Sequence, residues 1–83
     1  MTPAPGAPSP HLVTVSGQDA PGIARSLFTA LASEQVEVED VEQVRVHGRL
    51  LLCVEVRLRA KAVARMRAVL GDALREVGVE VGV

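Results

Sequence analysis

The clearest hydrophobic pattern lies in the middle of the chain. From Arg49 to Leu58 every second position is apolar, and a period of two indicates a β-strand with one buried face. The preceding segment, Val36 to Val46, is also rich in valine, but its alternation breaks near Asp40. We therefore predict a second strand with a β-bulge there. The dipeptide His47-Gly48 between the two segments predicts a tight turn, so the pair forms an antiparallel hairpin.

Segments with helical spacing flank this hairpin. After Pro21 the apolar residues recur every three or four positions, which predicts a helix as far as Ser33 with one buried face. Proline suits the first turn of a helix, because the N–H that it lacks would have no partner there. Asp19 is predicted to cap this helix. The same spacing returns from Ala60 to Val77 and predicts a second helix, which Gly78 ends.

Two short valine-rich runs complete the pattern, His11 to Ser16 and Val79 to Val83. The order strand, helix, strand, strand, helix, strand predicts an α+β fold, the ferredoxin-like βαββαβ sandwich, with two helices on one face of a four-stranded antiparallel sheet. The opposite face stays bare in such a fold. Because Leu51 and Cys53 fall on that face, we expect a partner subunit or a neighbouring domain to cover it.

The chain of 83 residues has room for a single domain. Residues 1–10 hold four of the five prolines and neither an apolar run nor a basic region. We predict that they form a disordered leader before a domain at 11–83, and that they are neither a signal peptide nor an anchor. No run approaches the roughly 18 apolar residues of a membrane span, so we expect no membrane association.

The charge pattern excludes several classes of function. Nine basic and ten acidic residues are interspersed, and Phe28 is the only aromatic residue, so we expect no nucleic-acid partner. Cys53 stands alone, without a partner for a disulfide or a Cys-x-x-Cys motif, and we expect a packed thiol in a reducing cytoplasm. His11 and His47 lack further ligands at metal-binding spacing. The serines lack a partnered base, so neither a metal, a cofactor nor a catalytic residue is predicted.

The turn Gly17-Gln18-Asp19-Ala20-Pro21-Gly22 is the best candidate for a binding site. It lies at the N-terminus of the first predicted helix, where free amide protons and a partial positive charge attract a carboxylate. Asp19 could accept hydrogen bonds from an ammonium group, and Gly22 has no side chain to block close approach. Alternatively, Asp19 only caps the helix while proline and glycine shape the turn. The local pattern permits both interpretations.

The Gly-x-Asp-x-Pro-Gly loop, followed by Ile23 and then Leu27-Phe28, resembles the signature of ACT domains. The resemblance extends from about His11 to Val83. The segment Asp40-Val41-Glu42-Gln43, followed by a Gly-Arg-Leu turn, is similar to the N-terminal ACT domain of actinobacterial phosphoserine phosphatases. The chain itself lacks the aspartyl-nucleophile motif expected of the catalytic domain of such a phosphatase, so we expect a regulatory domain and not an enzyme.

This resemblance implies a function in amino-acid binding. It implies a homodimer, or pairing with a second ACT domain, and a ligand held between the first loop of one copy and the second strand of the other. In phosphatases of this kind, the ligand would be serine. The implied site comprises Asp19, Ala20, Pro21, Gly22 and Ile23 of the loop, with Glu37 and Asp40 of the second strand. Glu37 stands where some ACT domains have asparagine.

Three other functions of the same fold compete with this one. A structural dimerisation module of the same ferredoxin-like fold would bind no ligand, and titration with serine would distinguish it. An enzyme of the acylphosphatase kind would need an arginine in the first loop to hold a phosphate, and the first arginine in this chain is Arg25, beyond that loop. A copper chaperone of this fold would need a Cys-x-x-Cys motif, which is also lacking.

Overall fold

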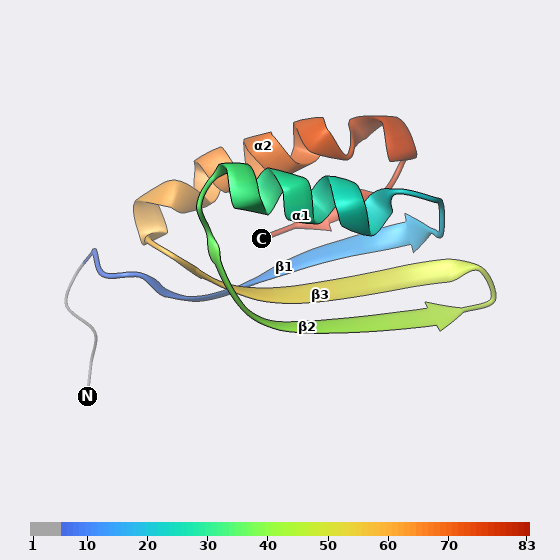
Figure 1. Ribbon diagram of the computed structural model, residues 1–83, viewed down its shortest axis with the longest axis horizontal. Coiled ribbons are helices and arrows are strands. Elements are labelled where there is room, and N and C mark those ends of the chain that lie inside the picture. Colours follow the sequence, from blue (N-terminus) through green and yellow to red (C-terminus); the bar gives the residue numbers. More distant parts are fainter. Residues whose placement is uncertain (1–5) are drawn as a thin grey trace.

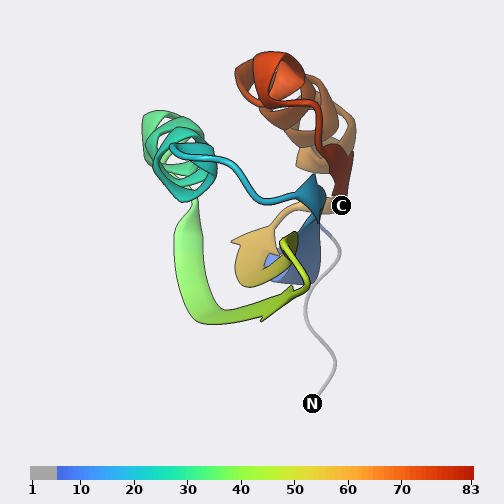
Figure 2. The ribbon, with the colours of Figure 1, turned by 90° about the vertical axis from the view of Figure 1, so that its right-hand side faces the viewer.

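The order of the elements is the predicted βαββαβ order. A computed structural model describes residues 6–83 of the chain. Its elements are β1 (Ser9–Gln18), α1 (Ile23–Ser33), β2 (Glu37–Val46), β3 (Arg49–Leu58), the 3-10 turn η1 (Ala60–Ala62), α2 (Val63–Ala73), the 3-10 turn η2 (Arg75–Val77) and β4 (Glu80–Gly82). The four strands form one antiparallel sheet in the order β2-β3-β1-β4. Both helices lie on the same face of this sheet (Figures 1 and 2), so the predicted fold class is confirmed.

The central hairpin has the predicted turn and the predicted bulge. His47 and Gly48 both take positive φ angles, 49° and 76°, as the two central residues of a type I′ turn require. The pairing of β2 with β3 shifts register between Val38 and Asp40, because one extra residue of β2 is accommodated there. From the turn back to Asp40 the two strands pair without interruption, so the turn sets which face each side chain of β2 occupies.

Two elements differ most from their predicted bounds, and the others differ by at most two residues at an end. β1 pairs with β3 over its whole length, from Ser9 opposite Leu58 to Gln18 opposite Arg49, so this strand begins two residues before the predicted boundary at His11. Residues 1–5 of the predicted leader lie outside the described residues. The second helix is shorter than the predicted span of Ala60 to Val77, because a 3-10 turn replaces the α-helix at each end.

The core lies between the two helices and the middle strands of the sheet. Valine, leucine, isoleucine, alanine and methionine side chains fill it, and no polar or charged side chain in the described part of the chain is buried. Its members are Val13, Val15, Ile23, Leu27, Ala30, Leu31, Leu50, Leu52, Val54, Val56, Leu58, Met66, Leu70 and Leu74. None of them comes from β2, so this edge strand lies outside the core.

The face of the sheet opposite the helices is open. Leu12 of β1 and Leu51 of β3 are exposed on it, and Cys53 is a free, half-buried thiol between the two neighbouring strands. This placement agrees with the strand parity read from the sequence. Within residues 6–83, no helix is long and apolar enough to cross a membrane.

Candidate functional site

The loop between β1 and α1 is tied to the β2–β3 turn by a backbone hydrogen bond. The amide of Asp19 donates to the carbonyl oxygen of Gly48 at 2.8 Å. β1 ends one residue earlier, and α1 begins at Ile23. The loop therefore crosses the end of the sheet beside the hairpin turn, and this brings two segments that are far apart in sequence to the same place.

The predicted capping role of Asp19 is wrong. The N-cap of α1 is Gly22, whose φ angle is 86°, and no described side chain caps this helix. The helix begins too far along the chain for Asp19 to reach its first turn as an N-cap residue does. Since glycine supplies no capping oxygen, the first amide N–H groups of α1 have no side-chain acceptor within the described chain. The carboxylate of Asp19 is directed elsewhere.

Asp19 forms an ion pair with an arginine of β2. The Nε atom of Arg45 donates to Oδ2 of Asp19 at 2.7 Å, across 26 positions of sequence. The Asp19 side chain is 31% exposed and that of Arg45 is 59% exposed. A solvent-exposed pair of this kind contributes only about 0.2–1 kcal/mol to folding. The pair therefore holds the two groups in place but breaks at little cost in free energy.

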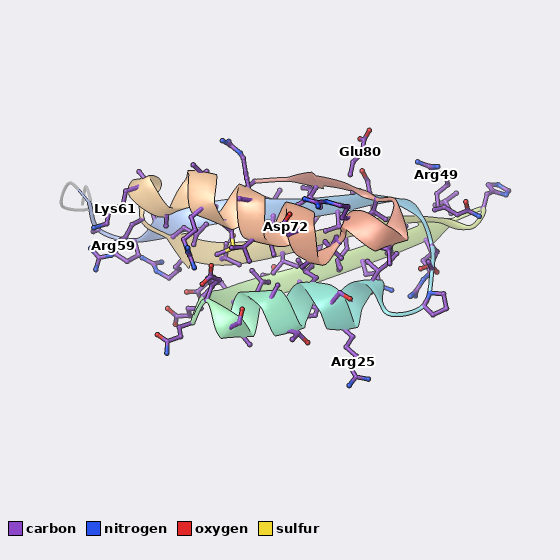
Figure 3. All side chains as sticks on the ribbon, turned by 90° about the horizontal axis from the view of Figure 1, so that it is seen from above. Arg25, Arg49, Arg59, Lys61, Asp72 and Glu80 are labelled. Atoms are coloured by element: carbon purple, nitrogen blue, oxygen red, sulfur yellow. The ribbon has the colours of Figure 1, made fainter. Side chains whose placement is uncertain are left out.

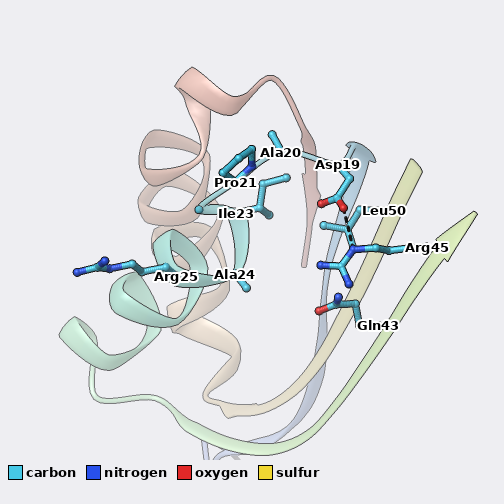
Figure 4. A pocket seen from close by; sticks show the side chains of 10 residues that line it. Asp19, Ala20, Pro21, Ile23, Ala24, Arg25, Gln43, Arg45 and Leu50 are labelled. Atoms are coloured by element: carbon cyan, nitrogen blue, oxygen red, sulfur yellow. Dashed lines mark hydrogen bonds and ion pairs between the residues drawn. The ribbon is translucent and has the colours of Figure 1, made fainter. Parts of the chain in front are cut away.

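A cavity of about 410 Å³ opens between the loop, the start of α1 and the end of β2. Figure 4 shows the Asp19–Arg45 pair on its sheet side, with Pro21 and Ile23 on its helix side. Arg25 projects from α1 away from the cavity (Figures 3 and 4). The lining residues are Asp19, Ala20, Pro21, Gly22, Ile23, Ala24, Arg25, Gln43, Arg45 and Leu50.

The structure brings together five of the seven residues assigned to the site from the sequence. Asp19, Ala20, Pro21, Gly22 and Ile23 all line the cavity. The second-strand residues do not join them in the same chain. Glu37 lies beyond the bulge, opposite Arg57 of β3. Asp40 lines a separate hollow of about 80 Å³ with Leu12 and Cys53.

The site predicted from the sequence did not include Gln43 and Arg45, although the strand pattern indicates on which side of the sheet they lie. Arg45 pairs directly with Leu50 in the ladder, and Gln43 pairs with Leu52. Leu50 and Leu52 belong to the buried face of β3, so their partners lie on the helix side of the sheet. Counting back from the His47-Gly48 turn would have placed both polar residues on that side. The bulge disturbs the register only beyond them.

The other candidate residues stay apart. His47 is exposed in the turn, and the ring of His11 makes a local hydrogen bond from Nδ1 to the Ser9 carbonyl oxygen at 3.0 Å. Among the side chains that the structure describes, no three histidine, cysteine, aspartate or glutamate residues gather where they could hold a metal ion. The arrangement at the loop is a small cavity whose wall carries the ion-paired carboxylate of Asp19 and guanidinium group of Arg45.

The comparisons with known proteins agree with this architecture. The family model described as "ACT domain" matches residues 9–83. This chain belongs to the ACT-domain family. An ACT domain protein from Streptococcus pneumoniae superposes with a TM-score of 0.78 at 17% identity, covering 92% of this chain and 86% of that one. At this identity the likeness concerns the fold.

Two curated relatives of this ACT domain are phosphoserine phosphatases. The chain is 49% identical over 45 residues to phosphoserine phosphatase of Streptomyces coelicolor. This match covers 54% of this chain and 11% of that protein. It is 39% identical over 74 residues to phosphoserine phosphatase SerB2 of Mycobacterium tuberculosis. This match covers 87% of this chain and 18% of that protein. The chain thus spans less than a fifth of the length of either relative.

Proposed function

We propose that this ACT domain is a regulatory module that binds a free amino acid, serine, in the cavity between the β1–α1 loop and β2. The observation that carries the proposal is the pair of opposite charges at the cavity wall, Asp19 and Arg45, at 2.7 Å. A zwitterion offers complementary charges to both groups. The volume of about 410 Å³ accommodates a small amino acid, and Gly22 keeps the wall beside the helix free of a side chain.

We further propose that the domain forms the N-terminal part of a phosphoserine phosphatase of serine biosynthesis. Both curated relatives carry that name and are several times longer than the stretch they share with this chain. In such a protein, catalysis belongs to another domain, and this one senses the product. Serine is then the natural ligand to test first.

The pairing surface that we propose is the outer edge of the sheet. β2 occupies that edge, and all ten of its residues are exposed. Val44 on β2 and Leu51 on β3 lie opposite each other on the open face and are 51% and 42% exposed. An edge strand with unpaired backbone groups and exposed valines invites a second strand. A second copy, or a second ACT domain, placed there would bring its own β2 near the loop.

Calorimetric titration of the chain with L-serine, and then with the other proteinogenic amino acids, tests the proposed function. We expect heat of binding with serine, and the titrations with the other amino acids measure the selectivity of the site. Asp19→Asn, which removes the charge but keeps the shape, should weaken binding about ten- to a hundredfold, as expected for loss of a charged hydrogen bond. Asp72→Asn, an exposed aspartate on α2, is the matched control and should bind normally.

The structural dimerisation module is the outcome that would replace this proposal. It predicts no heat with any amino acid while the mass in solution remains that of a dimer. Gly22→Val is a less clean test than Asp19→Asn. A Cβ atom at Gly22 meets no atom within 4 Å, but the φ angle of 86° strains any L-residue there.

A further inference from the structure

The ion pair between Asp19 and Arg45 occupies the position that a bound amino acid needs. Asp19 is the carboxylate that would accept a ligand ammonium group, and Arg45 already donates to it at 2.7 Å. A ligand therefore has to replace one of the two partners. Whatever binds must leave neither the carboxylate nor the guanidinium group without an opposite charge.

Arg45 is placed to meet a ligand rather than only to hold Asp19. It stands opposite Leu50, on the helix side of β2, and its side chain reaches into the cavity (Figure 4). Only Nε contacts Asp19. A guanidinium group carries five N–H donors in a planar fork, so its terminal nitrogens keep N–H groups for Gln43 and for a further acceptor.

Gln43 supports the same position of the guanidinium group. It precedes Arg45 by two residues and so lies on the same face of β2. Turned so that its amide oxygen faces the guanidinium group, Gln43 accepts from Nη2 of Arg45 at 2.8 Å. Of the two arginines that line the cavity, Arg25 points away from it and Arg45 points in. Among the described residues that line the cavity, Arg45 is thus the one cation that faces inward, and it is held from two sides.

We propose that Arg45 binds the α-carboxylate of the amino acid, so that the zwitterion replaces the Asp19–Arg45 ion pair. The ligand ammonium group takes the place of the guanidinium group on Asp19, and the ligand carboxylate takes the place of Asp19 on Arg45. This inference rests on the proposed function and goes beyond it by assigning the receptor for each charged group within a single chain. Arg45 is then a specificity-determining residue of the site.

This exchange selects for free amino acids. An amine without a carboxylate would pair with Asp19 but release Arg45 unpaired. A carboxylic acid without an amine would pair with Arg45 but leave Asp19 without an opposite charge. Only a zwitterion satisfies both groups, and the fork of an arginine matches the two oxygens of a carboxylate. The site should therefore discriminate serine from serinamide, which keeps the ammonium group and the hydroxyl but lacks the carboxylate.

The test is a calorimetric titration of four chains with L-serine and with serinamide. The chains are the wild type, Arg45→Gln, Arg45→Lys and the control Arg49→Gln. Arg49 lies at the same end of the hairpin but pairs opposite Val46 and does not line the cavity (Figure 3). Thermal unfolding of each chain verifies folding, which these exposed positions should preserve.

We expect Arg45→Gln to weaken serine binding about ten- to a hundredfold but not to weaken serinamide binding, because serinamide then pairs with Asp19 without releasing an unpaired guanidinium group. Arg45→Lys should recover part of the loss, because it keeps the charge without the fork. Arg49→Gln should match the wild type. Serine binding of normal strength in Arg45→Gln, or an equal loss of affinity for serine and serinamide, would overturn the role of Arg45. Either result would leave the proposed function in place. Failure of the wild type to bind any amino acid would overturn both.

Discussion

β2 and β3 are neighbours of equal length, yet their surroundings are opposite. Each has ten residues, and they pair along the whole hairpin. Five residues of β3 are buried, one at every second position, whereas every residue of β2 is exposed. The difference arises because the helices cover the middle of the sheet and β2 lies at its edge (Figure 2). Burial is thus decided by position in the sheet and not by the number of valines.

This difference also explains where the candidate site lies. On its helix side, β3 carries Leu50 and Leu52, which are 4% and 0% exposed. Their partners across the ladder are Arg45 and Gln43. A charged group opposite a buried leucine is tolerated because the edge strand stays in contact with water, where the cost of burying a charge does not arise. The edge of the sheet is therefore the place where this fold can carry polar binding residues at no cost to its core.

The largest expected effect is in the buried face of β3. Leu52→Ala removes a fully buried side chain and should lower the free energy of unfolding by about 2–5 kcal/mol, from lost burial and the cavity left behind. Leu51→Ala, one position away on the open face, should cost less than about 1 kcal/mol. Urea unfolding of both variants measures the contrast. Equal losses would mean that the open face is covered as fully as the core.

The next largest effect is expected for truncation of one of two valines that pair across the strands. Val54 and Val41 lie directly opposite each other, and they are 0% and 43% exposed. Val54→Ala should cost roughly 1–3 kcal/mol and Val41→Ala less than about 1 kcal/mol, since only the first deletes buried methyl groups.

Repeating these unfolding measurements over a range of protein concentrations sharpens the comparison. If a second copy covers β2, the cost of Val41→Ala grows with protein concentration, because the folded state is then stabilised by association. A cost that is independent of concentration, together with a monomeric mass, would contradict pairing through β2.

The smallest effect, that of His47→Asn, concerns the turn that joins the two strands. His47 is a non-glycine residue with a φ angle of 49°, and Asn is favoured over other side chains at this position of a type I′ turn. His47→Asn should therefore raise the free energy of unfolding slightly. Gly48→Ala, at a φ angle of 76°, should lower it by about 1–2 kcal/mol. Thermal unfolding measures both, and a stabilising Gly48→Ala would exclude the type I′ turn.

Much of the fold was predictable because its signals are local. The alternation from Arg49 to Leu58, the His47-Gly48 turn and the broken parity near Asp40 each depend on residues adjacent in sequence, and each is present in the structure. The ends of elements were less predictable. β1 extends to Ser9 because it pairs with β3 as far as Leu58. This pairing depends on residues distant in sequence, so the local pattern of β1 does not indicate it.

By itself, the sequence determined the order of the elements, the hairpin register near its turn and the loop of the candidate site. These follow from periodicity, turn chemistry and a continuous motif. Tertiary structure alone decided the partner of Asp19. A cap for the helix and a pair with Arg45 are both chemically reasonable for a carboxylate in that loop. The choice depended on the hydrogen bond from Asp19 to Gly48, which brings the loop against β2. That proximity joins residues 26 positions apart, and no local pattern encodes it.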